Sequence, residues 1–399
     1  MKGVLSGIRV LDFGRFISGP FSAMLLADMG AEVIKIEKPG GNTDRALGPY
    51  TANGNSMYAS VFSRNKKCIT INYRTEEGKE ILKKLICTAD VIIDNFRPGV
   101  MKKMGFSYED IIQYKPDIIM ASVSGFGQEG EYANRAAFDG IATAMAGAMC
   151  FNNLPGYGPR GLGTPVADIS TGYVNALSIM MALFHREKTG EGQFIDTAMV
   201  DCCVPLLETQ ITFYSLSGSH DTYPKALTRK GGDPMTAPAN TFKAKDGYFY
   251  MHAGTDSLFS VFAQLANDPE LLSEPYKQLT YRVEHADRVE ELAANWIATL
   301  TVEEAERIIG GAGIPCAIIN TVDRIVESDY AKSRKQVVSI DMPGVGPVSY
   351  LGNPIKLSKC PVEIFAPGQE PGQSNHEIYC DLLGYSEKEY QEFMEKKLI

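Results

Sequence analysis

One carboxylate in this sequence stands out because apolar residues flank it at the start of an expected helix. Asp168 lies in the segment Thr164–Gly172 (TPVADISTG), between Ala167 and Ile169. Apolar residues then recur at helical spacing over residues 173–185. A helix N-terminus favours the ionised form of an acid, and such a carboxylate can act as a nucleophile or general base. The plainer interpretation is an aspartate that only caps the helix, and this segment alone does not decide between the two.

The elements that precede this segment predict an α/β fold. Residues 8–13 form an apolar strand, Gly19-Pro20 opens a helix that ends at Gly30, and residues 31–37 form the next strand. Proline suits a first helical turn, because its missing N–H would be unpaired there anyway. A strand–helix–strand unit of this kind predicts two parallel strands joined by a right-handed crossover.

The turn after the first strand argues against a dinucleotide cofactor. A dinucleotide-binding turn has the pattern GxGxxG, with an acidic residue at the end of the second strand. Glu37 suits the acidic position, but the turn reads GRFISG. Arg15, Phe16 and Ile17 stand where a pyrophosphate needs bare backbone. We therefore do not expect NAD to bind.

Positive charge gathers in one part of an acidic chain, close to the strand-like runs 33–36, 68–71 and 91–96. Ligands bind at the carboxyl ends of strands in an open parallel sheet, so basic residues there suit a ligand with several phosphates. The alternative is a solvated surface on which these residues pair with nearby glutamates. The basic residues of this region include Lys35, Lys38, Arg45, Arg64, Lys66, Lys67, Arg74, Arg97, Lys102 and Lys103.

The composition narrows the class of protein. The chain has 399 residues and a net charge of −9, which argues against a general nucleic-acid binder. Its eight cysteines are scattered, with no CxxC pair and no histidine at metal-ligand spacing, as in reduced cytoplasmic proteins. The N-terminus lacks the apolar core of a signal peptide, and no apolar run is long enough to span a bilayer. We expect a cytoplasmic protein with no metal and no nucleic-acid or membrane partner.

Glycine, proline and polar residues mark a boundary within residues 217–239. After it, residues 241–253 alternate in polarity on both sides of Asp246-Gly247, which is typical of a β-hairpin. We predict a large domain over residues 1–220, a linker over 221–239 and a small α+β domain over 240–330. Residues 331–399 are predicted to form a further linker and a C-terminal tail.

Motifs spread along the chain carry a resemblance to a known family. They are LDF and SGPFSAMLLADMGAEVIKIEKPGG (11–41), NFRPG with MGF (95–106), SGFGQEG (124–130), FDG (138–140), PVADISTG (165–172), GQFIDTAMVD (192–201), GIPCAIIN (313–320) and GQSNHEIYCDLLGY (372–385). In this order and spacing they resemble the family III CoA transferases, which include formyl-CoA:oxalate and crotonobetainyl-CoA:carnitine CoA transferases. The resemblance runs nearly from end to end.

The resemblance implies a covalent mechanism for Asp168. This carboxylate would attack the thioester of an acyl-CoA, form a mixed aspartyl anhydride and release CoA thiolate. Exchange with the acceptor acid would then pass through an aspartyl-CoA thioester and a second anhydride. A carboxylate suits this role because the acyl group must leave as easily as it arrived. An acyl-CoA and a carboxylic acid would be the substrates, with no permanently bound cofactor.

The resemblance also assigns site residues. The positions that bind CoA in the family correspond to Phe16, Lys38, Asn72, Asn95, Phe96 and Lys103. The positions near the thioester correspond to Arg15, Ile17, Phe138 and Asp139.

The chain departs from the formyl-type enzymes around the expected acyl group. Those enzymes carry glutamine where this chain has Ile17, tyrosine where it has Phe138, and a glycine run where it has His252–Thr255. They also carry arginine where it has Lys38 and Lys103, which keep the charge but lose the bidentate fork. We infer a larger or more apolar acyl group than formyl or oxalyl.

The fold implied by the resemblance is an interlocked homodimer. Each chain would have a Rossmann-like α/β large domain with a parallel sheet and a smaller α+β domain, and its C-terminal tail would return to the large domain. One alternative function is an acyl-CoA racemase of the same superfamily, which uses a histidine and an aspartate. No histidine lies beside Arg15 or within residues 126–135. A second alternative is a non-catalytic CoA-binding protein, against which an intact Asp168 argues.

Overall fold

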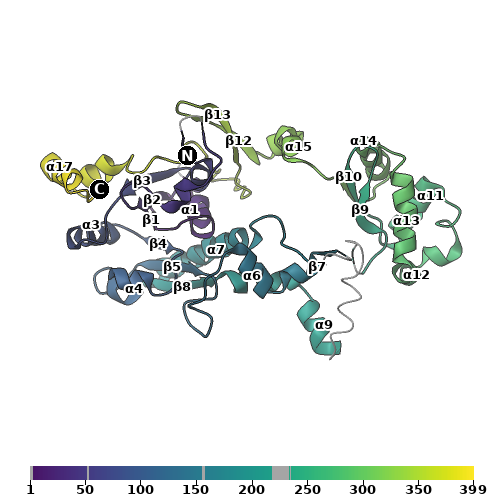
Figure 1. Ribbon diagram of the computed structural model, residues 1–399, viewed down its shortest axis with the longest axis horizontal. Helices are drawn as coiled ribbons and strands as arrows, with labels where there is room; N and C mark the ends of the chain where they lie inside the picture. Colours follow the sequence, from purple (N-terminus) through teal and green to yellow (C-terminus); the bar gives the residue numbers. More distant parts are fainter. Residues whose placement is uncertain (1–2, 52–53, 155–157, 218–232, 234) are drawn as a thin grey trace. The chain divides into compact units, whose positions relative to one another are not determined.

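The computed structural model describes residues 3–51, 54–154, 158–217, 233 and 235–399 (Figure 1). Two compact units divide the chain. The first comprises Met1–Ala146, Gly163–Leu206 and Val326–Ile399, and the second comprises Gly147–Leu162 and Leu207–Ile325. Most of the predicted linker over 221–239 lies outside the described residues.

A six-stranded parallel sheet forms the centre of the first unit and confirms the predicted α/β fold class. Its order is β3-β2-β1-β4-β5-β8, so the direction of strand order reverses between β1 and β4. The pairing of Val10 with Val33 on one side and Val91 on the other sets the register of the central strand. The strands are β1 (Arg9–Asp12), β2 (Glu32–Glu37), β3 (Lys66–Thr70), β4 (Val91–Asp94), β5 (Ile119–Ser124) and β8 (Gln193–Ala198).

Helices cover both faces of this sheet, as a doubly wound fold requires (Figure 1). On one face, α1 (Ser18–Asp28) and α7 (Val166–Thr189) bury Leu26 and Ile179 against the strands. On the other face, α3 (Glu76–Cys87) packs beside the C-terminal helices η6 (Glu377–Leu382) and α17 (Glu387–Glu395). The C-terminal segment therefore belongs to the core of the first unit.

A glycine lets α1 and α7 approach closely. A Cβ added to Gly172 of α7 would lie 2.6 Å from the Phe21 ring and 3.1 Å from the Ser18 carbonyl oxygen. Real side chains do not tolerate the first of these separations. Gly172 therefore allows the first turns of the two helices to lie side by side.

Among the described residues, α7 is the one helix whose length and composition would also suit a membrane span. This differs from the expectation drawn from the sequence. Ile179 and Ala182 of α7 are buried against the sheet and Asp168 stands in its first turn, so we interpret α7 as a core helix.

Shorter elements complete the first unit. They are η1 (Thr43–Ala46), α2 (Met57–Phe62), α4 (Val100–Met104), α5 (Tyr108–Ile111), α6 (Asp139–Met145), α8 (Met199–Cys203), η3 (Val204–Leu207), α16 (Asp329–Ser333) and the hairpin of β12 (Val337–Met342) with β13 (Gly346–Leu351).

The second unit has its own apolar core around a three-stranded antiparallel sheet. The sheet has the order β11-β10-β9, in which β9 (Ala239–Lys243) and β10 (Tyr248–His252) form the hairpin expected on both sides of Asp246. The remaining elements are η2 (Ala148–Phe151), β6 (Asn153–Leu154), β7 (Gly158–Pro159), α9 (Gln210–Ser217), α11 (Asp256–Ala266), η4 (Glu274–Lys277), α12 (Leu279–Glu284), α13 (Ala286–Ile297), α14 (Val302–Ala305), η5 (Glu306–Gly310), β11 (Cys316–Ile318) and α15 (Val322–Glu327).

Candidate active site

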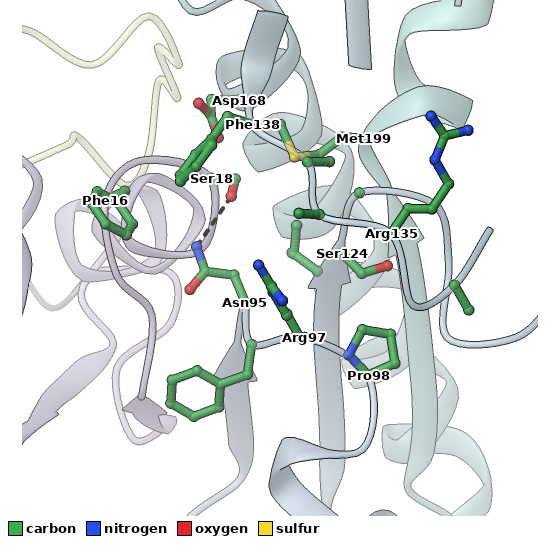
Figure 2. Close-up of a pocket in the computed structure, with 16 residues that line it drawn as sticks. Phe16, Ser18, Asn95, Arg97, Pro98, Ser124, Arg135, Phe138, Asp168 and Met199 are labelled. Carbon is green, nitrogen blue, oxygen red and sulfur yellow. Dashed lines mark hydrogen bonds between the residues drawn. The ribbon is translucent and has the colours of Figure 1, made fainter. Parts of the chain in front are cut away.

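A pocket opens where the strand order reverses, at the carboxyl ends of β1 and β4 (Figure 2). Open α/β sheets bind ligands at this position, because the loops diverge there. Phe16 and Ser18 follow β1 and Asn95 follows β4, while Phe138 and Asp168 come from later parts of the chain. The fold therefore brings Asp168 to the wall of this pocket.

Asp168 stands in the first turn of α7 and meets the first residue of α1. The hydroxyl and the backbone N–H of Ser18 lie close to the Asp168 carboxylate and lower its pKa. This N–H is available because the first N–H groups of a helix have no partner within the helix. The carboxylate therefore lies against the positive end of a second helix.

Burial raises the pKa of Asp168 to about 6, and the neighbouring Asp139 carboxylate adds to this rise. The hydroxyl and N–H of Ser18 act in the opposite direction and lower the pKa. The dipole of α7 was expected to favour the ionised form, but desolvation outweighs it here. The carboxylate is still ionised at neutral pH, and it is more basic than a solvated aspartate.

Asp139 holds the start of α7 in place. The helix has no side-chain cap of its own, since Pro165 occupies the N-cap position. The Asp139 Oδ1 atom accepts hydrogen bonds from the backbone N–H of Ala167 at 2.6 Å and of Asp168 at 3.2 Å. Asp139 was predicted near the thioester. The structure places it behind the backbone of Asp168, outside the residues that line the pocket.

Aromatic rings form part of the pocket wall. The rings of Phe16 and Phe138 meet edge to face, with centroids 5.9 Å apart. Phe138 is 68% exposed, so its ring is free to cover a bound ligand. The Arg15 guanidinium lies 5.1 Å from the centre of the Phe96 ring, and Arg15 itself does not line the pocket.

The other predicted site residues lie outside the pocket lining. Ile17 is buried in an apolar cluster with Phe21 and Met24, so its side chain serves the core. Lys38 and Asn72 directly follow β2 and β3, and Lys103 lies on α4 after β4. These three residues share the carboxyl edge of the sheet with the pocket, because parallel strands end on one side.

Sequence reasoning missed several residues of the pocket. Ser18 and Met199 were not singled out, and Arg135 falls in a stretch, 128–137, without periodicity. Arg135 is held over the rings of Phe126 and Tyr132, at 5.3 and 5.0 Å from their centres. Ser18 could have been identified from its position alone, because it begins the helix that follows β1 at the carboxyl edge of the sheet.

Other reactive groups near Asp168 are poor nucleophiles. Burial, with the Asp139 and Asp168 charges among the smaller causes, raises the pKa of the Cys203 thiol to about 11. Burial and the charge of Asp168 raise the pKa of Tyr58 to about 12. Both groups are therefore protonated at neutral pH, and Asp168 is the one carboxylate among the described residues that line the pocket.

One group of side chains in the described part of the chain has the composition of a metal site. His376, Cys380 and Glu387 hold their ligand atoms within 4.8 Å of one another on the C-terminal segment. None of them lines the pocket, so the chemistry there does not involve them.

Comparisons with known proteins identify the family of the chain. The model of CoA-transferase family III matches residues 5–375. The chain is 33% identical to succinyl-CoA–D-citramalate CoA-transferase of Chloroflexus aurantiacus, over 99% of this chain and 98% of the relative. It is 34% identical to mouse succinyl-CoA:glutarate CoA-transferase, over 96% and 87%.

A solved structure shares the fold. The CAIB/BAIF family protein from Brucella suis superposes with a TM-score of 0.84 at 31% identity, covering 96% of this chain and all of that one. The match of the family model over most of the length and the identity to whole transferases support one assignment. The chain is a family III CoA-transferase.

Proposed function

We propose that this enzyme moves CoA from an acyl-CoA thioester to a carboxylic acid through covalent intermediates on Asp168. The observation that carries the proposal is the position of Asp168, a partly desolvated carboxylate that lines the pocket and faces the start of α1. Family membership supports the reaction type. No histidine is among the described residues that line the pocket, so nothing in it favours a racemase.

The proposed reaction runs in four exchanges, with no net proton transfer. The Asp168 carboxylate attacks the acyl carbon, the C–S bond breaks, and CoA leaves as a thiolate. The thiolate attacks the aspartyl carbonyl and expels the first acid as its carboxylate. The acceptor carboxylate then displaces the thiolate to form a second anhydride. The thiolate finally takes the new acyl group and restores Asp168.

Ser18 supports these steps electrostatically in our proposal. Negative charge builds on the aspartyl carbonyl oxygen whenever the thiolate or an acid attacks it. The N–H and hydroxyl of Ser18 lie beside this group and lower its pKa, so they are placed to stabilise the charge. Phe138 would cover the anhydride and exclude water, which would otherwise hydrolyse it.

We propose succinyl-CoA as donor and a dicarboxylic acid as acceptor, because the named relatives use succinyl-CoA with D-citramalate or glutarate. Succinyl is larger than formyl or oxalyl, in line with the larger acyl group expected from the sequence, and of the two residues behind that expectation Phe138 lines the pocket. The test follows CoA esters by chromatography after succinyl-CoA is mixed with glutarate, malate, citramalate or acetate. New CoA esters of the dicarboxylic acids are expected, and their complete absence for every acid would refute the proposal.

We propose that the CoA phosphates bind at the carboxyl edge of the sheet. Lys38 and Lys103 are exposed there, and neither forms an ion pair within the described residues. Replacing either by alanine is expected to weaken CoA binding about tenfold in isothermal titration, as for one charge-assisted contact. Lys359→Ala, another exposed lysine of the first unit, is the control. Unchanged affinity in both variants would place the phosphates elsewhere.

We also propose that the protein is a homodimer. One side of α7 exposes Leu177, Met181 and Phe184 at 56%, 61% and 59%, a helical apolar stripe that a partner chain would cover. Analytical ultracentrifugation is expected to give twice the chain mass of 43.6 kDa. A monomer at micromolar concentration would contradict the proposal.

A further inference from the structure

Both ends of the Asn95 side-chain amide make hydrogen bonds within the protein. Its Oδ1 atom accepts from the backbone N–H of Arg15 at 2.8 Å. Its Nδ2 atom donates to the carbonyl oxygen of the same residue at 2.7 Å and to the Ser18 hydroxyl at 3.3 Å (Figure 2). One amide therefore brackets residue 15 from both sides and reaches the first residue of α1.

The bracketed loop needs such support. Phe16, the next residue, has a φ angle of 62°, in the left-handed region that costs a residue with a Cβ about 1–3 kcal/mol. Gly19 lies against the Asn95 side chain, and a Cβ there would be 3.3 Å from Asn95 Cγ. The loop from β1 to α1 is thus shaped around this amide.

The backbone around Asn95 is also fixed. The preceding Asp94 is buried at the end of β4, where its carboxylate accepts from the Ser122 hydroxyl at 2.5 Å and from the Phe96 N–H at 3.1 Å. These contacts hold the backbone on both sides of Asn95. A rigid strand end therefore carries the amide that holds the loop.

We propose that Asn95 is a positioning residue for Asp168, which it serves by holding the Arg15–Ser18 loop so that Ser18 stays beside the carboxylate in the wall of the pocket. This inference rests on the proposed function of Asp168 and assigns Asn95 a different role from the CoA contact expected from the family resemblance. Both N–H groups of the amide are already used within the protein, so it has no donor left for a ligand. Its effect on the reaction passes through Ser18.

The test measures Asp168 directly in the full-length protein. Carbon-13 NMR of the aspartate carboxyl groups gives the titration of Asp168, assigned by its loss in Asp168→Asn. The charged or titratable neighbours that face this group are Asp139 from α6, Tyr58 from α2 and Cys203 from α8. None of them changes in Asn95→Ala or Asn95→Gln. The second variant keeps an amide but sets it one methylene too far out to bracket Arg15.

Either variant is expected to raise the pKa of Asp168 by about one unit, because Ser18 no longer stays beside the carboxylate to lower its pKa. We expect kcat to fall about 100-fold, as when one preorganised donor is removed, while KM for the acyl-CoA changes less than about threefold. Asn375→Ala is the matched control, since the Asn375 amide also holds a single residue at a strand end: it accepts from the Thr70 N–H at 2.9 Å and donates to the Thr70 hydroxyl at 3.0 Å. This control is expected to lower stability without moving the titration.

Two results would overturn the inference. One is a tenfold rise in KM with kcat and the Asp168 titration unchanged, which would make Asn95 a CoA ligand. The other is an equal titration shift in Asn375→Ala, which would indicate general loosening. If the wild-type protein transfers no CoA, the proposed function fails, whereas the NMR titration still decides whether Asn95 acts on Asp168.

Discussion

Replacing Asp168 by alanine is expected to lower kcat for CoA transfer by about 10⁴-fold or more, as when a covalent nucleophile is removed from an enzyme. Asp168→Asn is expected to be as inactive, because the amide keeps the shape of the side chain but cannot form an anhydride. Asp341→Asn changes an exposed aspartate of β12 and is expected to keep full activity. Full CoA-transfer activity in Asp168→Ala would refute the covalent mechanism.

The covalent step also has a direct chemical signature. After incubation with acyl-CoA, the wild-type enzyme is expected to lose activity in hydroxylamine, which captures an aspartyl thioester or anhydride as a hydroxamate. Mass spectrometry of the peptide that contains Asp168 should show the added mass. The same treatment without acyl-CoA should leave the peptide unchanged. Modification at another carboxylate instead would show that Asp168 is not the nucleophile.

The pKa of Asp168 adds a pH dependence with a defined sign. Attack requires the carboxylate, so kcat/KM is expected to fall tenfold per pH unit below about 6, the value to which burial raises this group. Because the folded state holds this proton more tightly than the unfolded chain does, folding stability falls as pH rises from about 4 to 6. Asp168→Asn is therefore expected to gain up to about 3 kcal/mol of unfolding free energy at pH 7.

Replacing Asp28 by alanine is expected to cost about 3–5 kcal/mol of unfolding free energy, because it leaves a buried guanidinium without its counter-charge. Asp28 accepts from Arg64 at 2.6 and 3.2 Å, and both side chains are fully buried. Asn65 and Asn353 donate to the same carboxylate at 2.9 and 3.1 Å. Asp28 thus ties the end of α1 to the segments after α2 and β13.

Urea denaturation at pH 7 measures this loss. Glu76→Ala breaks the exposed ion pair with Lys79, whose atoms lie 2.7 Å apart, and is expected to change stability by less than about 0.5 kcal/mol. Adding Arg64→Met to Asp28→Ala should recover part of the loss, since it removes the unpaired charge. A loss below about 1 kcal/mol in Asp28→Ala would mean that water reaches Arg64.

The sequence by itself determined the elements and the motif that carries the chemistry. Apolar runs such as residues 91–96 identified strands, because a strand buried on both faces needs an unbroken apolar stretch. The flanking residues of Asp168 identified a poorly hydrated carboxylate. Both properties depend on near neighbours in the chain, and those can be read directly.

Tertiary structure alone decided what each side chain does at the site. Asp139 reaches the N–H groups of residues 167 and 168 from another helix, Ile17 turns into the core, and Asn95 brackets Arg15 from 80 residues away. The direction of the Asp168 pKa shift likewise follows from burial and from Asp139, and it reversed the expectation from the helix dipole. Desolvation and hydrogen bonds between distant segments arise only on packing, so no local pattern of residues contains them.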